Sequence, residues 1–276
     1  MKGKKSNIVI YILLVILAVI FLAPIFIILF NSFKGKLYIS DAPFKLPTSE
    51  TFVGVQNYID GLSKTGFLSA FGWSIFITFF STIVIVLFTS MTGWYITRAK
   101  NKVSTALYFI FVFSMIVPFQ MVMFTMSKVA NMLSLDNPIG LIVLYLGFGA
   151  GLSIFMFSGF VKSIPIDIEE AALIDGCNPI KTFFLIVLPL LKPICITVAI
   201  LNVMWIWNDY LLPSLVLKSD YKTIPMAVQY LRGGYGAIDM GAMMAVLVLA
   251  IIPIIIFYLT CQKYIIEGVA AGAVKG

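Results

Sequence analysis

Long apolar segments dominate the chain, and shorter polar stretches separate them. An apolar run of about 18 residues or more is long enough to cross a bilayer as an α-helix. The pattern predicts six transmembrane helices within a single domain, residues 1–276. They lie near residues 8–30, 69–97, 103–126, 139–161, 193–212 and 240–261. The fold class that we expect is all-α and integral to a membrane.

Composition supports this class. Hydrophobic residues make up 61% of the chain and charged residues 11%, whereas about a quarter of a typical soluble domain is charged. This apolar excess cannot be buried inside one globule, so lipid must form part of the solvent. The net charge of +7 comes from basic residues scattered among the loops. Such scatter favours a role in membrane topology over nucleic-acid binding.

Basic residues also predict the orientation, because lysine and arginine concentrate on the cytosolic side. The tightest group is Arg98, Lys100 and Lys102. Placing this group inside puts both termini and the segment 162–192 in the cytosol. The basic start of the chain is similar to a signal peptide, but the apolar run behind it is too long, so we expect a retained anchor. The outer loop 213–239 contains a glycine-rich turn, Arg232–Gly236.

Residues for catalysis and metal binding are sparse. Histidine is absent, which removes the commonest general base and the commonest zinc ligand. Cys177, Cys195 and Cys261 have no CxxC spacing, so neither a metal site nor a disulfide is predicted. No Gly-Lys-Ser or Gly-Lys-Thr occurs, so the chain has no phosphate-binding loop of the nucleotide-binding type. We expect no catalytic residue and no metal.

The predicted cytosolic segment 162–192 begins with a short acidic helix. Pro165 suits a helix start, and Asp167, Glu169 and Glu170 place negative charge near its positive end. Gly176 is the expected terminator, because glycine tolerates the left-handed conformation that ends many helices. The small alanines on this helix allow another protein to approach its backbone closely.

A second helix follows at once. Asn178 is a suitable cap, and Pro179 suits the first helical position. We expect this helix to run until Pro189. Two short helices joined at a rigid corner form a lever that can transmit force, although an ordinary amphipathic loop that caps the bundle remains an alternative.

Several motifs together resemble those of ABC-type import permeases. They are Glu170-Ala171-Ala172, Asp175-Gly176 and Leu188-Pro189, with Pro118-Phe119-Gln120, Ile164-Pro165, Trp207-Asn208-Asp209-Tyr210 and the terminal stretch from Glu267 to Gly276. The chain is similar over nearly its whole length to the carbohydrate branch, in particular to the maltose and multiple-sugar (MalG-like) permeases. One departure is Cys177, which stands where that family usually has alanine.

The resemblance implies the type I ABC importer permease fold, with an EAA coupling helix that docks on a cytosolic ATPase. The residues implied for coupling are Glu170, Ala171, Ala172, Asp175, Gly176, Cys177 and Pro189. The tail 263–276, with Gly268, Gly272 and Gly276, is implied to lie near the ATPase. The implied partners are a second permease subunit (MalF-like), an ATPase homodimer, an extracellular sugar-binding protein and membrane lipid. The implied location is a bacterial plasma membrane, with ATP and magnesium bound by the ATPase and no cofactor in this chain.

Polar and aromatic residues at membrane depth are candidates for the substrate pathway. They are Gln120, Trp205, Trp207, Asn208, Asp209 and Tyr210, with Asn202 one turn earlier. Aromatic faces with nearby amide and carboxylate groups would suit a sugar. Alternatively, the tryptophans and the tyrosine belong to an interfacial belt at the end of the membrane helix. Asn208 and Asp209 would then cap that end or bond a neighbouring helix.

Two other functions compete with a sugar permease. An ion-coupled secondary transporter would need buried ionisable residues as an ion relay. Apart from Asp209, the predicted spans hold almost none. A membrane scaffold without transport is the third possibility, and the motif at Glu170 favours the permease over it.

Overall fold

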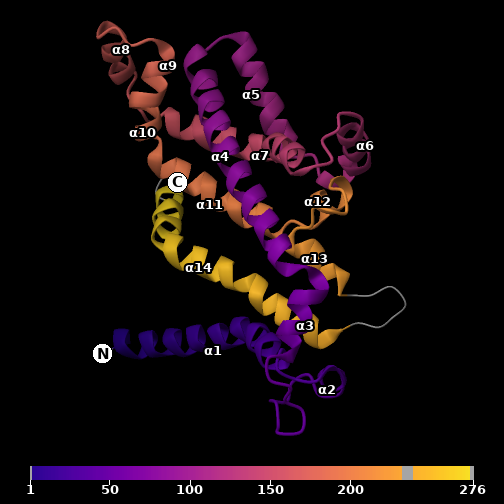
Figure 1. Ribbon diagram of the computed structural model, residues 1–276. Helices are drawn as coiled ribbons and strands as arrows, with labels where there is room; N and C mark the ends of the chain where they lie inside the picture. Colours follow the sequence, from indigo (N-terminus) through magenta and orange to yellow (C-terminus); the bar gives the residue numbers. More distant parts are fainter. Residues whose placement is uncertain (1, 232–238, 274–276) are drawn as a thin grey trace. The chain divides into compact units, whose positions relative to one another are not determined.

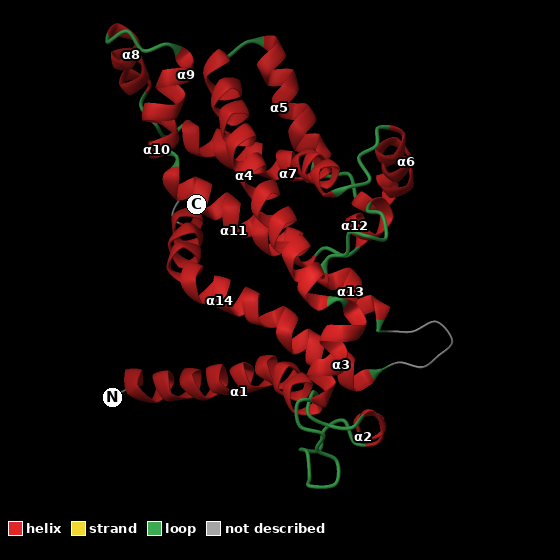
Figure 2. Cartoon of the chain, viewed as in Figure 1, coloured by secondary structure: helices red, strands yellow, loops and turns green. Residues whose placement is uncertain are grey.

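The computed structural model describes residues 2–231 and 239–273 (Figure 1). Helices and loops make up the described part, and its only β-type pairing is an isolated bridge between Lys34 and Phe52 (Figure 2). The predicted glycine-rich turn Arg232–Gly236 and the terminal Gly276 lie outside the described residues. The long elements are α1 (Lys2–Asn31), α4 (Phe67–Ala99), α5 (Lys102–Ser114), α6 (Phe119–Met132), α7 (Pro138–Val161), α11 (Lys192–Asn208) and α14 (Met240–Ala273). The short ones are α2 (Lys36–Asp41), α3 (Gln56–Thr65), α8 (Ile166–Ile174), α9 (Pro179–Thr182), η1 (Phe183–Val187), α10 (Leu188–Leu190), α12 (Leu211–Val216) and α13 (Ile224–Tyr230).

Four of these helices are long and apolar enough to cross a membrane unbroken. The apolar stretches are Ile10–Asn31, Phe67–Ala99, Pro138–Val161 and Met240–Tyr264. Two bent pairs bring the number of candidate spans to six if each pair is counted as one. The helix bounds correspond to the predicted segments 8–30, 69–97, 139–161 and 240–261, although α14 continues to Ala273 through most of the predicted tail.

The third predicted segment, 103–126, is not one continuous helix. It is divided into α5 and α6, whose axes are bent by 106°. Pro118 stands at the break as the cap of α6, with an extended backbone (φ −62°, ψ 136°). Proline has no backbone N–H to donate and disfavours a helical conformation in the preceding residue, so α5 cannot continue through it.

The fifth predicted segment, 193–212, also differs. A bend of 77° separates Pro179–Leu190 from α11, and α11 ends at Asn208 because Asp209 is extended (φ −73°, ψ 124°). Before the bend, η1 is a π-helical turn in which the Leu188 N–H bonds the Phe183 carbonyl. Pro189 cannot donate the next bond, and such local loss of a donor is a common cause of bends.

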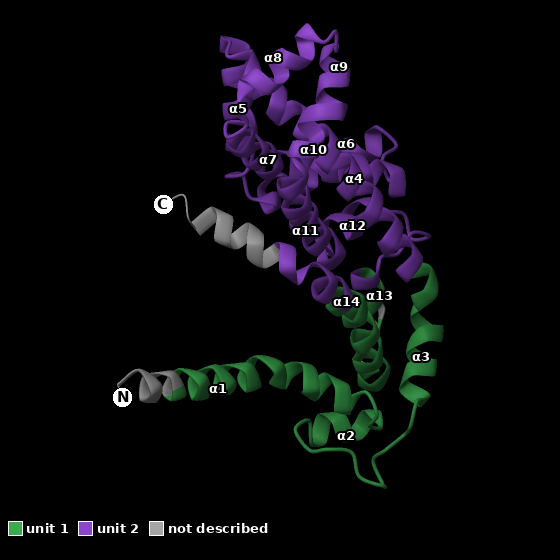
Figure 3. Cartoon of the chain, turned by 90° about the vertical axis from the view of Figure 1, so that its left-hand side faces the viewer, with its two compact units in different colours: residues 1–70, 226–255 green, residues 71–225, 256–276 purple. Residues whose placement is uncertain are grey.

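The chain divides into two compact units (Figure 3). Unit 1 comprises residues 1–70 and 226–255. Its polar centre is Asn57, whose side chain donates to the Ser32 and Lys34 carbonyls at 2.8 Å each. Lys34 is itself buried; its ammonium donates to the Ala42 carbonyl at 2.9 Å and lies 5.0 Å from the Phe30 ring centre. These bonds tie the end of α1 to α3.

Unit 2 comprises residues 71–225 and 256–276, with α7 packed against both α5 and α11. An apolar cluster joins the last turns of α7 to η1 through Phe157, Val161, Phe183 and Val187. A side chain at Gly93 would collide with Phe157, so glycine lets α4 approach α7 closely. The residues after α7 are thereby held against a rigid core.

Candidate coupling site

The helices α8 and α9 lie at the same end of unit 2 as the connection between α4 and α5, in both views (Figures 1 and 3). The basic residues of the two segments predict that both lie on one side of the membrane. Their common placement within unit 2 agrees with that assignment. Which side it is remains a prediction.

Helix α8 begins where the sequence predicted. Pro165 is its cap residue, and Asp167 and Glu169 carry the negative charge of its first turn. Their charge favours the helix because the unpaired N–H groups of a first turn form a positive end.

The end of α8 is a Schellman turn. Gly176 has φ +82°, a left-handed conformation that residues with a side chain rarely adopt. The Cys177 N–H bonds the Ala172 carbonyl at 2.9 Å, and the Gly176 N–H bonds the Leu173 carbonyl at 3.1 Å. Two otherwise unpaired carbonyls of the helix end are thus satisfied. The predicted role of Gly176 as terminator is confirmed.

The second helix starts directly after this turn. The Asn178 side chain accepts a hydrogen bond from the Lys181 N–H at 2.8 Å, and Pro179 occupies the first turn. Helix α8 packs against both α9 and η1. The corner is thus determined by a cap, a left-handed glycine and direct packing of the two helices.

One carboxylate joins this corner to α4. Glu169 is 6% exposed. Its Oε1 accepts from Nε and Nη2 of Arg98 at 2.9 and 2.7 Å, and its Oε2 accepts from the Trp94 indole N–H at 2.9 Å. Arg98 also donates to the Ile164 carbonyl at 2.9 Å. Charge-assisted hydrogen bonds of this kind are strong and directional, so they link the first turn of α8 firmly to the last turn of α4. We call this group the Glu169 anchor.

Sequence reasoning missed the Glu169 anchor. It placed Glu169 in the first turn of a helix and Arg98 among the topological charges. The partners are 71 residues apart, and no spacing rule connects them. The available signal was a pair of opposite charges on the same predicted side, with Arg98 directly after one apolar segment and Glu169 in the loop after another.

The outer surface of α8 is accessible and partly apolar. Glu170, Ala171 and Asp175 are exposed, and Ile174 is 87% exposed. Ala172 differs, since it is buried within the chain. Of the two alanines predicted to meet a partner, only Ala171 presents its side chain outward. Packing within unit 2 therefore explains the small residue at position 172.

Of the two tryptophans that are candidates for the pathway, one is buried and the other is accessible. Trp207 is buried, edge-on to Phe71, with ring centroids 6.1 Å apart. Trp205 is 39% exposed and lies edge-on to the Tyr145 ring at 5.4 Å. A substrate could reach Trp205 directly, whereas the Trp207 ring is occupied by packing.

Asp209 is held by three groups of this chain. The Tyr145 hydroxyl donates to its Oδ2 at 3.0 Å, and its Oδ1 accepts from the N–H groups of Leu211 and Leu212 at 3.0 and 3.4 Å. The bond from Tyr145 of α7 confirms the predicted bond to a neighbouring helix. The helix that Asp209 caps is α12, which starts after the fifth segment, and not the end of that segment. The hydrogen bond from Tyr145 to Asp209 also holds the Tyr145 ring edge-on to Trp205.

The remaining pathway candidates differ in their exposure and in their hydrogen-bond partners. Gln120 is exposed in the first turn of α6, and Tyr210 is 41% exposed. Asn208 is exposed and donates to the Met204 carbonyl one turn back. Asn202 is buried and bonds the Val198 carbonyl at 2.8 Å. Contact with substrate stays a prediction for each of them.

Comparison with known proteins identifies the family. Residues 87–270 match the family described as "Binding-protein-dependent transport system inner membrane component". The chain belongs to this family. The match includes the Glu169 anchor, α8 and α9, and it confirms the family-level resemblance that the motif at Glu170 indicated.

Curated relatives in this family align over nearly their full length. The chain is 40% identical to "Probable starch degradation products transport system permease protein AmyC" of Thermoanaerobacterium thermosulfurigenes, covering 95% of this chain and 94% of the relative. It is 35% identical to "Multiple sugar-binding transport system permease protein MsmG" of Streptococcus mutans, covering 96% of each. It is 31% identical to "Melibiose/raffinose/stachyose import permease protein MelC" of Bacillus subtilis, covering 99% and 98%.

A solved structure shares the fold. A chain in the crystal structure of a bacterial ABC transporter involved in the import of the acidic polysaccharide alginate superposes with a TM-score of 0.79. It covers 96% of this chain and 98% of that chain, at 24% sequence identity. The family and the fold together make this chain a multi-pass membrane permease component of an ABC transporter.

Proposed function

We propose that this chain is one of two permease subunits of an ATP-driven importer of sugars or oligosaccharides, and that α8 and α9 couple it to a cytosolic ATPase. The observation that carries the coupling role is the Glu169 anchor, because it joins an exposed helical corner to the long helix α4. A force applied to α8 would reach α4 through the hydrogen bonds between Glu169 and Arg98, and not only through the connecting backbone.

The exposed surface of α8 supports a protein partner. Ile174 is almost fully exposed beside Glu170 and Asp175. Exposed apolar side chains flanked by charges are a common composition for a docking site, where the apolar groups are buried and the charges orient the partner. The ATPase would supply a groove with a basic rim and bind the ATP and magnesium. This chain would then be a transport subunit without catalytic residues.

The substrate class follows from the relatives. Starch degradation products, multiple sugars and raffinose-type sugars appear in the names of three relatives that align over nearly the whole chain. In this chain, Trp205 offers an accessible ring face next to Tyr145. Aromatic rings beside hydrogen-bonding groups suit sugar recognition, so we place Trp205 in the pathway, with Gln120, Asn208 and Tyr210 as further candidates.

The remaining parts of the assembly complete the proposal. A second permease subunit supplies the other half of the pathway, and an extracellular binding protein delivers the sugar. Both termini lie in the cytosol, as the basic residues predict. ATP binding and hydrolysis shift the pair of permeases between inward-open and outward-open states.

The test is isolation of the intact assembly from native membranes in mild detergent. We expect an ATPase and a second permease to accompany the tagged chain. Ile174→Glu should abolish ATPase recovery, because it places a charge in the docking surface. Leu46→Glu is the control, since Leu46 is 69% exposed in a loop predicted on the opposite side. Equal ATPase recovery with Ile174→Glu and the unaltered chain would refute docking through α8.

A further inference from the structure

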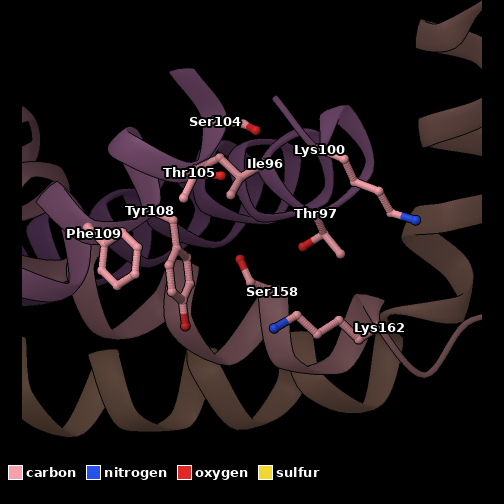
Figure 4. Close-up of a pocket in the computed structure, with 9 residues that line it drawn as sticks. All are labelled: Ile96, Thr97, Lys100, Ser104, Thr105, Tyr108, Phe109, Ser158 and Lys162. Atoms are coloured by element: carbon pink, nitrogen blue, oxygen red, sulfur yellow. The ribbon is translucent and has the colours of Figure 1, made fainter. Parts of the chain in front are cut away.

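A cavity of about 250 Å³ lies at one side of unit 2, where α4 and α7 end and α5 begins (Figure 4). Its lining includes Thr97 of α4, Ser104 and Tyr108 of α5, and Lys162 directly after α7. Lys100 lines it from the connection between α4 and α5. The cavity is separate from the outer surface of α8 and from the pathway candidates, and neither role uses it.

The cavity is positively charged. Lys100 and Lys162 line it, and none of the nine lining residues is acidic. Neither lysine forms a salt bridge within the part of the chain that the structure describes. Arg98, close by in sequence, is in contrast committed to Glu169. Two uncompensated ammonium groups at one cavity attract an anion.

The position of Lys162 suits a small oxyanion. The Lys162 ammonium lies 5.9 Å from the centre of the Tyr108 ring, and in Figure 4 it extends beneath Ser158 toward Tyr108. The cavity also borders the first turn of α5, which has 13 residues. The N-terminus of that helix adds a partial positive charge. A phosphate group has the charge and the hydrogen-bond acceptors that this arrangement requires.

The surroundings favour a phosphate that belongs to a lipid. Phe109 lines the cavity and is 63% exposed. The large side chains of Tyr95 on α4 and Ile110 on α5 are also exposed. The cavity lies at the ends of predicted spans, at the level where headgroups meet acyl chains. Apolar side chains at its rim can contact those acyl chains, whereas they would gain nothing from a free phosphate ion.

We propose that this cavity binds the phosphate of an anionic phospholipid headgroup, with Lys162 as the cationic ligand and Lys100 adding positive charge at the rim. Basic pockets between membrane helices on the cytosolic side have the required chemistry, because the cytosolic leaflet carries anionic lipid. Bound lipid would neutralise the two lysines and hold the α4–α5 corner against α7. That corner also carries Arg98, so lipid would brace the base of the Glu169 anchor.

The test measures lipid binding to the intact assembly in detergent, by native mass spectrometry with phosphatidylglycerol and with phosphatidylcholine. We expect several-fold preferential retention of phosphatidylglycerol. Lys100→Gln with Lys162→Gln should weaken its binding by about fivefold per lysine, from roughly 1 kcal/mol for each basic residue near an anionic surface. The matched control is Lys102→Gln with Lys192→Gln, because both lysines are exposed on the same predicted side and neither lines the cavity.

Two results would overturn the proposal. One is equal phosphatidylglycerol binding by the cavity variant and the control variant, with both eluting as intact assemblies. The other is displacement of the lipid by millimolar inorganic phosphate or glycerol phosphate, which would assign the cavity to a free phosphate compound. A cavity that selects lipid should keep phosphatidylglycerol under both competitors.

Discussion

Arg98 donates two hydrogen bonds to a single carboxylate oxygen of Glu169, at 2.9 and 2.7 Å, and so joins the end of α4 to the first turn of α8. The side chains are 18% and 8% exposed. Breaking a buried ion pair leaves an uncompensated charge, which typically costs about 3–5 kcal/mol. The pair therefore contributes both to the stability of unit 2 and to the transmission of movement.

Removal of the carboxylate should uncouple the transporter. We expect Glu169→Ala to lower the thermal stability of the assembly, by an amount toward the lower end of about 3–5 kcal/mol because water reaches Arg98. Transport should fall more than ATP hydrolysis does. The control is Asp136→Ala, which removes the partner of the 61% exposed Lys218 and should cost about 1 kcal/mol or less. Equal effects of the two substitutions would show that Glu169 has no special role.

The coupling corner should depend on the left-handed conformation of Gly176. Nothing lies within 4 Å of a side-chain carbon placed there, so a substitution acts through backbone strain alone. Gly176→Val should lose most sugar-stimulated ATP hydrolysis, since a left-handed residue costs about 1–2 kcal/mol. Gly176→Asn should keep most of it, because asparagine tolerates this conformation. Similar activities for both variants, measured in proteoliposomes, would contradict the prediction.

Close packing of α5 on α7 should be sensitive to one methyl group. A side-chain carbon at Gly151 would lie 2.7 Å from the Phe111 carbonyl oxygen, so Gly151→Ala should destabilise the chain by about 1–3 kcal/mol through overpacking. Gly147 lies one turn earlier on α7 and has open space around it. Gly147→Ala is the matched control and should leave the melting temperature nearly unchanged. A melting curve in detergent tests both variants.

The two tryptophans of α11 should separate into different functions. Trp205→Ala should lower sugar uptake while leaving the assembly intact, because its ring is accessible. Trp207→Ala should lower stability by about 3–5 kcal/mol, as expected for a buried aromatic residue. Uptake kinetics and thermal stability, measured on the same preparations, test whether the two residues have these separate roles. Normal uptake by a stable Trp205→Ala assembly would remove Trp205 from the pathway.

Acid should weaken unit 1 through Asp239. Burial alone would raise the pKa of this carboxyl, but hydrogen bonds from Lys64 and from the Ala242 N–H, with the nearby positive charge, lower it below its ordinary 3.8. The unfolded chain therefore takes up the proton first as the pH falls. The stabilisation is complete above pH 3.8 and is lost as the pH falls through the lower pKa of the folded state.

The variant Asp239→Asn isolates this charge, because asparagine can still cap α14. We expect it to be less stable than the unaltered chain at pH 7, by about 1 kcal/mol or less given that Lys64 is half exposed. The difference should shrink progressively as the pH falls below 3.8. A difference in melting temperature that is independent of pH would assign the effect to packing and not to the charge.

Local chemistry was readable from the sequence. Gly176 ends α8, and Asn178 with Pro179 starts α9, because capping depends on a few adjacent residues. The long apolar runs predict helices of membrane-spanning length for the same reason, since length and hydropathy need no knowledge of the rest of the chain. The break at Pro118 was present in the sequence as well, but a proline can bend a membrane helix slightly or divide it, and only its surroundings decide which.

The sequence by itself therefore determined the class of protein, most helix positions and the place of the coupling motif. The tertiary structure decided which of those residues act inward and which outward. Ala172 and Trp207 are buried within unit 2, whereas Ile174 and Trp205 remain accessible. The partnership of Arg98 with Glu169, and the approach of Lys100 and Lys162 to one cavity, arise between segments distant in sequence. Long-range contacts of this kind depend on how helices pack, and helix packing is set by many side chains at once.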